Sequence, residues 1–428
     1  MVGGGAGYLA GNRGLGGRSG AGSGAAGTLD PLRVVAVLPL TGPTANDGLH
    51  AANGTQLAIN EINDLGGVLG RKLQYVPVDL GAIEDPQGVR NAFSRAVSQE
   101  KPDVIVGSGI AAMGPDLDVP AQAGVIYLHG DTREDWRNLY LADPAKYWPV
   151  FQTDPAETAY GRGFALFLDQ LVQTGKYKPS AKTVALIAGD DPYDTHITSV
   201  FKDGIAKLGW TITFTGSVTP NQVVDWGPIL SQIRQNPPAV VFTTDYSSAE
   251  DAAMAKNFAA SPIPSLLYQQ YGPSAPEWLD LAGAAGNGVI WSTVLGLQVD
   301  PIGNKFRERY RAAYKIEPSW AYAGALYDNV WLWAEAVMKA DDPKDVRKVA
   351  KVIETGVHRG VTGGMSFGRY EGDTFVQDHT VPSYPSETPD PSVGQPHIIV
   401  QVQNGAHKVI YPAPFTNSDF QLPPWLHQ

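Results

Sequence analysis

The sequence predicts an α/β protein with two doubly wound, Rossmann-like lobes. The chain has 428 residues, enough for two domains of roughly 150 residues and a tail. Short apolar runs that suit buried strands alternate with helical periodicity, which predicts parallel sheets covered by helices on both faces. The alternation restarts after residues 151–155, so we expect the second lobe to begin there.

The first lobe is expected to alternate strand and helix from its first apolar run. The run at 34–38 suits a buried strand, and apolar residues then recur at helical spacing until Gly66 and Gly67 end the helix. Further strands are expected at 73–79, 104–106 and 125–128. Further helices are expected at 89–97 and 116–123.

The second lobe is expected to repeat this alternation and to end in a hairpin. Strands are expected at 183–187, 211–214, 240–242, 265–269 and from 287. Helices are expected at 160–171, 197–208, 229–233, 249–258, 306–314 and 326–337. Residues 381–396, rich in Pro and Ser, predict a loop. Two apolar runs then flank Asn404 and Gly405, which supply the positive φ angles of a type I′ turn.

Composition excludes several classes of protein. The net charge of −11 disfavours nucleic acid and anionic membrane as partners. The chain has no cysteine, which excludes disulfides, thiolate metal sites and cysteine nucleophiles. No apolar run reaches the length of about 18 residues that a membrane-spanning helix needs.

Residues 1–31 have the composition of a disordered tether. Gly, Ala and Ser dominate this stretch, which cannot bury enough apolar area to offset its ordering entropy. It also lacks the apolar core of a signal peptide. Two interpretations stay open: an export signal was replaced by Met1, or a mature linker spaces the protein from a membrane or cell wall.

Motifs of enzymes and metal sites are incomplete in this sequence. The glycines at 107–114 do not have the spacing of a dinucleotide fingerprint, and no Lys-Ser/Thr of a P-loop follows them. There is no Gly-x-Ser-x-Gly nucleophile motif, and no two His residues have helical metal-ligand spacing. The acids at 190–194 lack the Gly and the final Glu of a calcium loop. We therefore expect no catalytic residue, no metal and no cofactor.

Two segments resemble a known family. Residues 34–79, with VVAVLPLTGP and LAINEINDLGGVLGRKLQYVPVD, and residues 322–337 resemble the leucine/isoleucine/valine-binding family of type I periplasmic binding proteins. The resemblance implies three hinge crossovers between the lobes. It divides the chain into lobe 1, at 32–150 and 286–355, and lobe 2, at 151–285 and 356–428.

The same resemblance implies a function. The chain is expected to be the solute-binding component of an ABC importer, periplasmic or extracellular and associated with a membrane or wall. Its expected partners are a small amino-acid or amide-like ligand and the permease subunits, and a monomer is expected. The alternative is a ligand-sensing receptor module for amides, urea or aromatic acids. A secreted hydrolase or dehydrogenase is disfavoured by the missing motifs described above.

The candidate binding residues follow the strands. In open α/β sheets ligands bind beyond the carboxyl ends of strands, where polar groups and tyrosines can orient a small solute. The loops expected there are 41–48, 108–112, 129–132, 190–193, 244–247 and 269–271. The ligand contacts implied by the resemblance are Asp47, Ser108, Ala111, Ala112, Asp131, Thr132, Tyr193, Tyr246, Gln270 and Tyr271.

This chain departs from the family at its charged contacts. The serine that grips the ligand's carboxylate falls at Ala111 or Ala112, so backbone N–H groups and Ser108 are expected to replace it. The acid that pairs with the ligand's ammonium falls near 269–271, where no residue is charged. An aromatic position of the family aligns with Asp47.

The missing acid leaves two alternatives for the ligand. A buried ammonium without a carboxylate costs roughly 1–3 kcal/mol or more. One alternative is that Asp131, Asp47 or Asp245 replaces the acid. The other is that the ligand carries no ammonium, as in a neutral amide, urea, a polyol or an aromatic acid.

Overall fold

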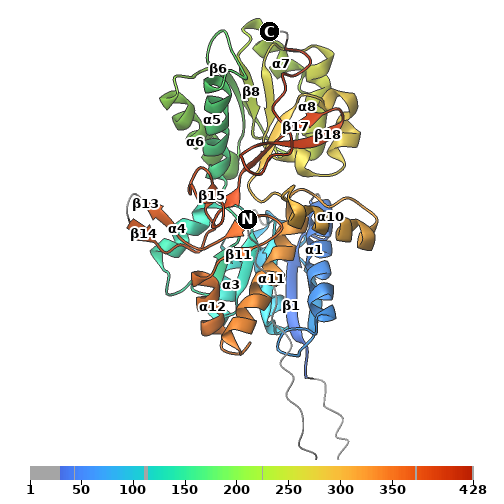
Figure 1. Cartoon of the computed structure of the whole chain (residues 1–428), viewed down its shortest axis with the longest axis vertical. Coiled ribbons are helices and arrows are strands. Elements are labelled where there is room, and N and C mark those ends of the chain that lie inside the picture. The colour runs from blue at the N-terminus through green and yellow to red at the C-terminus, as the bar shows by residue number, and fades with distance from the viewer. Residues whose placement is uncertain (1–28, 43, 110–113, 224, 372–373, 427–428) are drawn as a thin grey trace, which may run out of the picture.

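The computed structural model describes residues 29–426, except 43, 110–113, 224 and 372–373. The predicted tether at 1–31 therefore lies outside the described residues, apart from its last three. The described chain forms two α/β lobes, one above the other in Figure 1. This arrangement confirms the predicted fold class.

The first lobe contains a five-stranded parallel sheet in the order β2-β1-β3-β4-β5. Its strands are β1 (Leu32–Leu38), β2 (Leu73–Asp79), β3 (Val104–Ser108), β4 (Tyr127–Gly130) and β5 (Val150–Gln152). Its helices are α1 (Ala45–Asp64), α2 (Pro86–Ser98), α3 (Pro115–Ala123) and α4 (Glu134–Ala142). Helix α2 begins at a cap that the sequence encodes: Asp85 accepts a hydrogen bond from the backbone of Gln87, and Pro86 has no N–H to leave unpaired.

The second lobe contains a seven-stranded sheet in the order β18-β17-β10-β9-β8-β6-β7. The parallel strands are β6 (Thr183–Gly189), β7 (Thr211–Val218), β8 (Val240–Thr243), β9 (Leu266–Gln269) and β10 (Ile290–Thr293). The antiparallel hairpin is β17 (Ile398–Gln403) and β18 (Ala406–Tyr411). Its turn residues Asn404 and Gly405 have φ of 51° and 73°, as the sequence predicts for a type I′ turn.

Helices cover this sheet, and two short 3-10 turns follow β9. The helices are α5 (Thr158–Gln173), α6 (Pro192–Lys207), α7 (Gly227–Gln235), α8 (Ser248–Ala260) and α9 (Trp278–Ala282). The 3-10 turns are η1 (Gly272–Ser274) and η2 (Gly283–Gly286).

The chain then returns to the first lobe. Helices α10 (Pro301–Tyr314), α11 (Tyr322–Ala340) and α12 (Val346–Thr355) follow β10. The two-residue strands are β11 (His358–Arg359), β12 (Gly364–Met365), β15 (Ser383–Tyr384) and β16 (Gln395–Pro396), and between them β13 (Arg369–Glu371) pairs with β14 (Thr374–Val376). Helix α11 packs closely on α1, because a Cβ added at Gly54 would lie 2.0 Å from the carbonyl oxygen of Ala323.

Two of the lobe boundaries expected from the sequence are corrected by the sheet pairing. Strand β10 pairs with β9 and β17, so the second lobe continues past residue 286 to at least Thr293. The segment after 356 does not pass directly to the second lobe. It lies along the first lobe, where Trp136 Nε1 donates to the carbonyl of His379 at 3.3 Å. These pairings join residues far apart in the chain, which local periodicity does not report.

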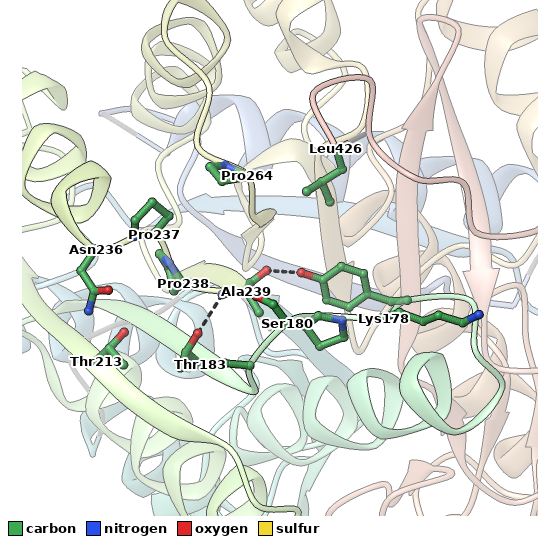
Figure 2. Close-up of a pocket in the computed structure, with 13 residues that line it drawn as sticks. Lys178, Ser180, Thr183, Thr213, Asn236, Pro237, Pro238, Ala239, Pro264 and Leu426 are labelled. Atoms are coloured by element: carbon green, nitrogen blue, oxygen red, sulfur yellow. Dashed lines mark hydrogen bonds between the residues drawn. The ribbon is translucent and has the colours of Figure 1, made fainter. Parts of the chain in front are cut away.

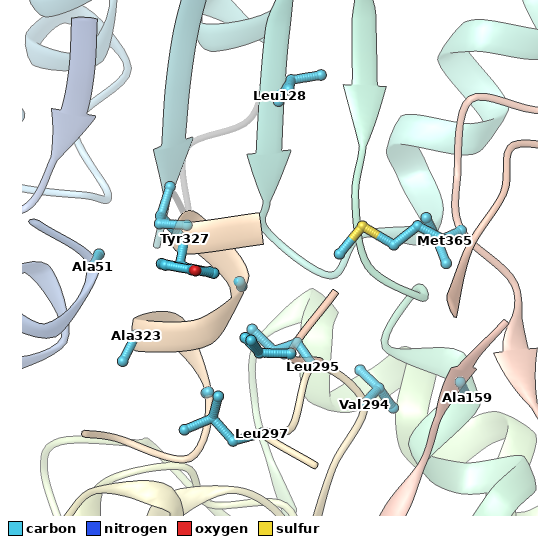
Figure 3. Packing of buried hydrophobic residues seen from close by; sticks show 14 of the residues in the cluster. Ala51, Leu128, Ala159, Val294, Leu295, Leu297, Ala323, Tyr327 and Met365 are labelled. Atoms are coloured by element: carbon cyan, nitrogen blue, oxygen red, sulfur yellow. The ribbon is translucent and has the colours of Figure 1, made fainter. Parts of the chain in front are cut away.

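A continuous apolar cluster connects the lobes at these crossovers. Figure 3 shows Ala51 of α1, Ala323 of α11 and the crossover residues Leu295 and Leu297 within one cluster, with Met365 close by. All of them are buried. The crossovers are therefore packed segments of the apolar core.

Candidate ligand-binding site

Direct contacts join the two lobes next to the carboxyl ends of their strands. Asn46 in the first turn of α1 donates from Nδ2 to both carboxylate oxygens of Glu277, at 2.8 and 2.9 Å. The rings of Tyr271, after β9, and Tyr322, at the start of α11, meet edge to face with centroids 6.3 Å apart. The structure therefore has the lobes in contact across the region where ligand residues were predicted.

Asp47 lies beside this contact. It is half-buried in the first turn of α1. Burial, and then repulsion from Glu277, raise its pKa to about 7. It also raises the pKa of the Tyr271 and Tyr322 hydroxyls, after the effect of their burial, so it lies near both phenols. Asp47 thus lies beside the contact between the lobes, and its role in ligand binding stays a prediction.

The second lobe contributes two tyrosines that contact each other. Tyr193, in the first turn of α6, and Tyr246, after β8, meet edge to face with centroids 6.0 Å apart. Gln270 Nε2 donates to the Tyr193 hydroxyl at 3.1 Å, and the Tyr246 hydroxyl donates to Asp191 Oδ2 at 3.2 Å. The structure therefore brings together Tyr193, Tyr246 and Gln270, which the sequence places on three separate loops.

The first lobe contributes Thr132 and Asp154. Thr132 has φ of 50°, a left-handed conformation that is strained for a β-branched residue and is typical of functional sites. Its N–H points to Asp154 Oδ1 at 3.4 Å. Asp154 is fully buried, and burial followed by repulsion from Asp131 raises its pKa well above the usual range.

Asp154 was missed by the sequence interpretation. It follows β5 at the first crossover, within the residues 151–155 that served only to mark the boundary. Its position beyond the carboxyl end of a parallel strand was the signal that could have identified it. Tyr322, which meets Tyr271 across the lobes, was not singled out either, because it belongs to a helix start that local patterns do not link to this region.

Asp131 has partners within the first lobe. Its Oδ2 lies 3.1 Å from His129 Nδ1, and both side chains are buried. The same buried network holds Arg133 and Asp116, whose Nη1 and Oδ2 are 3.5 Å apart. Asp131 also raises the pKa of Tyr127, after the effect of burial. It is therefore one member of a buried network of polar and charged groups, and its role as the ligand's acid stays a prediction.

The other predicted residues are placed as follows. Asp245 Oδ1 accepts from the N–H of Ser247 at 3.0 Å, at the turn into α8, and burial raises its pKa to about 8. Ser108 ends β3 and is buried. Ala111 and Ala112 lie outside the described residues.

Buried acceptors without a donor among the described residues include oxygens of Asp194, Asp245 and Gln269, and two more that follow strands of opposite lobes. These two are Asp154 Oδ2 and Gln270 Oε1, and both side chains have no exposed surface. A buried polar atom without a partner costs about 1–3 kcal/mol, so such atoms are rare in native structures unless a ligand or water satisfies them. The two atoms come from opposite lobes.

The cavity in Figure 2 is a different feature. It has a volume of about 400 Å³ and lies at the amino ends of β6 and β8, with Thr183, Asn236 and Pro237 in its lining. The Tyr177 hydroxyl beside it donates to the carbonyl of Ala239 at 2.7 Å. Since Tyr193 and Tyr246 follow the opposite ends of these strands, this cavity is not part of the interlobe site.

Metal and membrane features were sought in the same residues. Within the described ranges no three His, Asp or Glu side chains are grouped to hold a metal ion. None of the helices described is both long and apolar enough to cross a membrane.

Comparisons with known proteins agree with this architecture. A family model described as periplasmic binding protein matches residues 31–382. A solved structure from Silicibacter pomeroyi, described as a branched-chain amino acid ABC transporter, has a TM-score of 0.84 at 32% identity and covers 92% of this chain and 100% of that chain.

More distant relatives match over most of the chain as well. The Leu/Ile/Val-binding protein homolog 3 of Brucella melitensis is 25% identical over 328 residues, 76% of this chain and 83% of that protein. The Streptococcus pneumoniae substrate binding protein LivJ, solved with isoleucine, has a TM-score of 0.69 at 19% identity over 89% of this chain and 100% of that chain. Because the family model spans most of its length, the chain belongs to the periplasmic binding protein family.

Proposed function

We propose that this protein is the extracytoplasmic solute-binding component of an ABC importer and closes its lobes on a small polar solute. The observation that carries the proposal is the interlobe contact, in which Asn46 and Tyr322 meet Glu277 and Tyr271. A ligand held by both walls stabilises the closed arrangement by its differential contacts with that state. Membership of the periplasmic binding protein family supports the same function.

The proposal includes the protein's setting. The protein acts outside the cytoplasm, periplasmic or extracellular, as a monomer. Permease subunits of the importer recognise its closed form and take up the ligand. It binds without a chemical step, in agreement with the names of its relatives, which describe binding proteins.

Calorimetry and small-angle X-ray scattering test this function together. A ligand found in a screen of amino acids, amides, amines, polyols and aromatic acids should bind with roughly micromolar affinity, about −8 kcal/mol, and reduce the radius of gyration. Tyr193→Ala should weaken binding at least about tenfold through lost packing and hydrogen bonding. The control is Tyr177→Phe, at the distant cavity, which should bind normally. Failure of every class to bind, or conversion of the ligand, would exclude the proposal.

A further inference from the structure

The interlobe site offers acceptors to its ligand. Asp154 Oδ1 is approached by the N–H of Thr132, while Asp154 Oδ2 has no donor among the described residues. Gln270 uses its Nε2 on the Tyr193 hydroxyl, which leaves Oε1 as a second buried acceptor without a donor. A ligand that supplies N–H donors to both atoms removes their burial cost.

Aromatic rings and carboxyl groups lie near one another in this region. The pKa of Tyr322 is raised by burial first, and then by Asp47, Asp131 and Asp154. That of Tyr271 is raised by burial and then by Asp47. The two phenols therefore lie near carboxyl groups of the first lobe. Tyrosine faces and carboxylates together attract a cation.

One buried guanidinium lies beside these acids, that of Arg133, and its Nη2 has no hydrogen-bond partner among the described residues. The buried guanidinium of Arg133 lies 3.5 Å from Asp116 and is also close enough to Asp131 to have its pKa raised by it. In the described part of the chain, no ion pair joins a Lys or Arg to Asp47 or Asp154. Because burial raises the pKa of both carboxyl groups, a cationic ligand would favour their charged form, and a carboxylate on the same ligand would then be repelled by them.

We propose that the ligand is a small organic cation that carries N–H donors and no carboxylate, such as a primary amine, an amidine or a guanidine, with Asp154 as its counter-ion. The inference rests on the proposed function, since it names the ligand class of the same site. No residue at 269–271 is charged, so the acid that pairs with the ligand's cation has to come from elsewhere. In this proposal Asp154 at the first crossover supplies that acid, and Gln270 adds a neutral acceptor from the second lobe.

Pairs of probes that differ mainly in a carboxylate separate the effect of ligand charge from the effect of ligand shape. The full chain is screened by thermal shift and calorimetry with four pairs: agmatine and arginine, putrescine and 4-aminobutyrate, leucinamide and leucine, benzylamine and benzoate. In at least one pair the member without a carboxylate should bind at least about tenfold more tightly. Benzyltrimethylammonium, a cation without N–H donors, should bind more weakly than benzylamine. The proposal is overturned if the carboxylate members bind more tightly or if no cation binds.

Variants test the residue assigned as counter-ion. Asp154→Asn should weaken the best cation at least about thirtyfold, the loss expected when one partner of a buried charge pair is removed. Asp47→Asn changes a half-buried side chain in the first turn of α1 and should weaken binding of the best cation about three- to tenfold. This second variant still tests the proposal if Asp154→Asn does not fold. Asp341→Asn, an exposed change at the end of α11, is the charge-matched control and should bind normally.

The outcomes distinguish this inference from the proposed function. Tight binding of leucine or benzoate with lobe closure, unaffected by Asp154→Asn and Asp47→Asn, would refute the cation and keep the solute-binding function. The absence of binding and closure with every probe of every charge would refute both.

Discussion

Replacing Asp328 is expected to destabilise the protein strongly, because this carboxylate organises the return segment after α12. Asp328 is buried in α11, and its Oδ1 accepts from the N–H of Val361 at 2.9 Å. Its Oδ2 accepts from the N–H and the hydroxyl of Thr362, at 2.9 and 2.6 Å. The carboxylate sits so close to the backbone that a Cβ at Gly360 would lie 2.2 Å from it.

The magnitude follows from the donors that the substitution leaves behind. In Asp328→Ala two buried backbone N–H groups lose their acceptor, each at about 1–3 kcal/mol, and the charge-assisted bond from Thr362 is lost as well. We expect a loss of about 3–5 kcal/mol in the free energy of unfolding. Asp328→Asn keeps one acceptor oxygen and should fall between wild type and Asp328→Ala.

Urea denaturation followed by circular dichroism measures the change. The matched control is Asp342→Ala, an exposed residue whose Oδ1 accepts from the N–H of Lys344 at 2.8 Å, and it should cost less than about 1 kcal/mol. If Asp328→Ala costs no more than Asp342→Ala, the carboxylate does not hold the return segment and the reasoning is refuted.

Three further predictions concern packing, pH and the interlobe contact. Gly54→Ala should lower stability by about 1–3 kcal/mol in urea denaturation, because its Cβ would lie 2.0 Å from the Ala323 carbonyl; an unchanged midpoint contradicts the close packing of α1 on α11. Burial, and then repulsion from Asp191, raise the pKa of Asp194 to about 9 in the folded protein, against about 3.8 in the unfolded chain. The folded state therefore binds this proton more tightly, and the stability that the proton contributes is complete below pH 3.8 and is lost as pH rises toward 9. The melting temperature should therefore fall between pH 5 and pH 9, and less so in Asp194→Asn; equal falls would count against this assignment. Glu277→Ala removes the acceptor of Asn46 and should weaken binding of the best ligand about two- to fivefold, as measured by calorimetry. The effect is small because an exposed contact contributes no more than about 1 kcal/mol. A larger loss would show that Glu277 contacts the ligand itself.

The fold could be predicted because its signals are local. The alternation of apolar runs and helical periods predicts the parallel sheets, and Asn404-Gly405 predicts the β17–β18 hairpin that the structure contains. The lobe boundaries could not be predicted in this way. Whether the run before Thr293 belongs to the first or second sheet depends on its pairing with β9 and β17, and β17 comes more than a hundred residues later.

The site was predictable only in part for the same reason. Tyr193, Tyr246 and Gln270 follow separate strands, and the rule that ligands bind beyond the carboxyl ends of strands places them together. Asp131 and Asp154 satisfy this rule equally well. The distinction between them is tertiary, since Asp131 turns to His129 within a charged network while Asp154 keeps a buried oxygen without a donor.

The sequence by itself determined the class of fold, the two lobes and the family resemblance, because these signals are carried by residues that are neighbours in the chain. Only the tertiary structure decided where the chain crosses between lobes and which buried carboxyl oxygens have no donor among the described residues. Burial and hydrogen-bond partners decide that choice, and both depend on segments that meet only after the two sheets have packed around the crossovers.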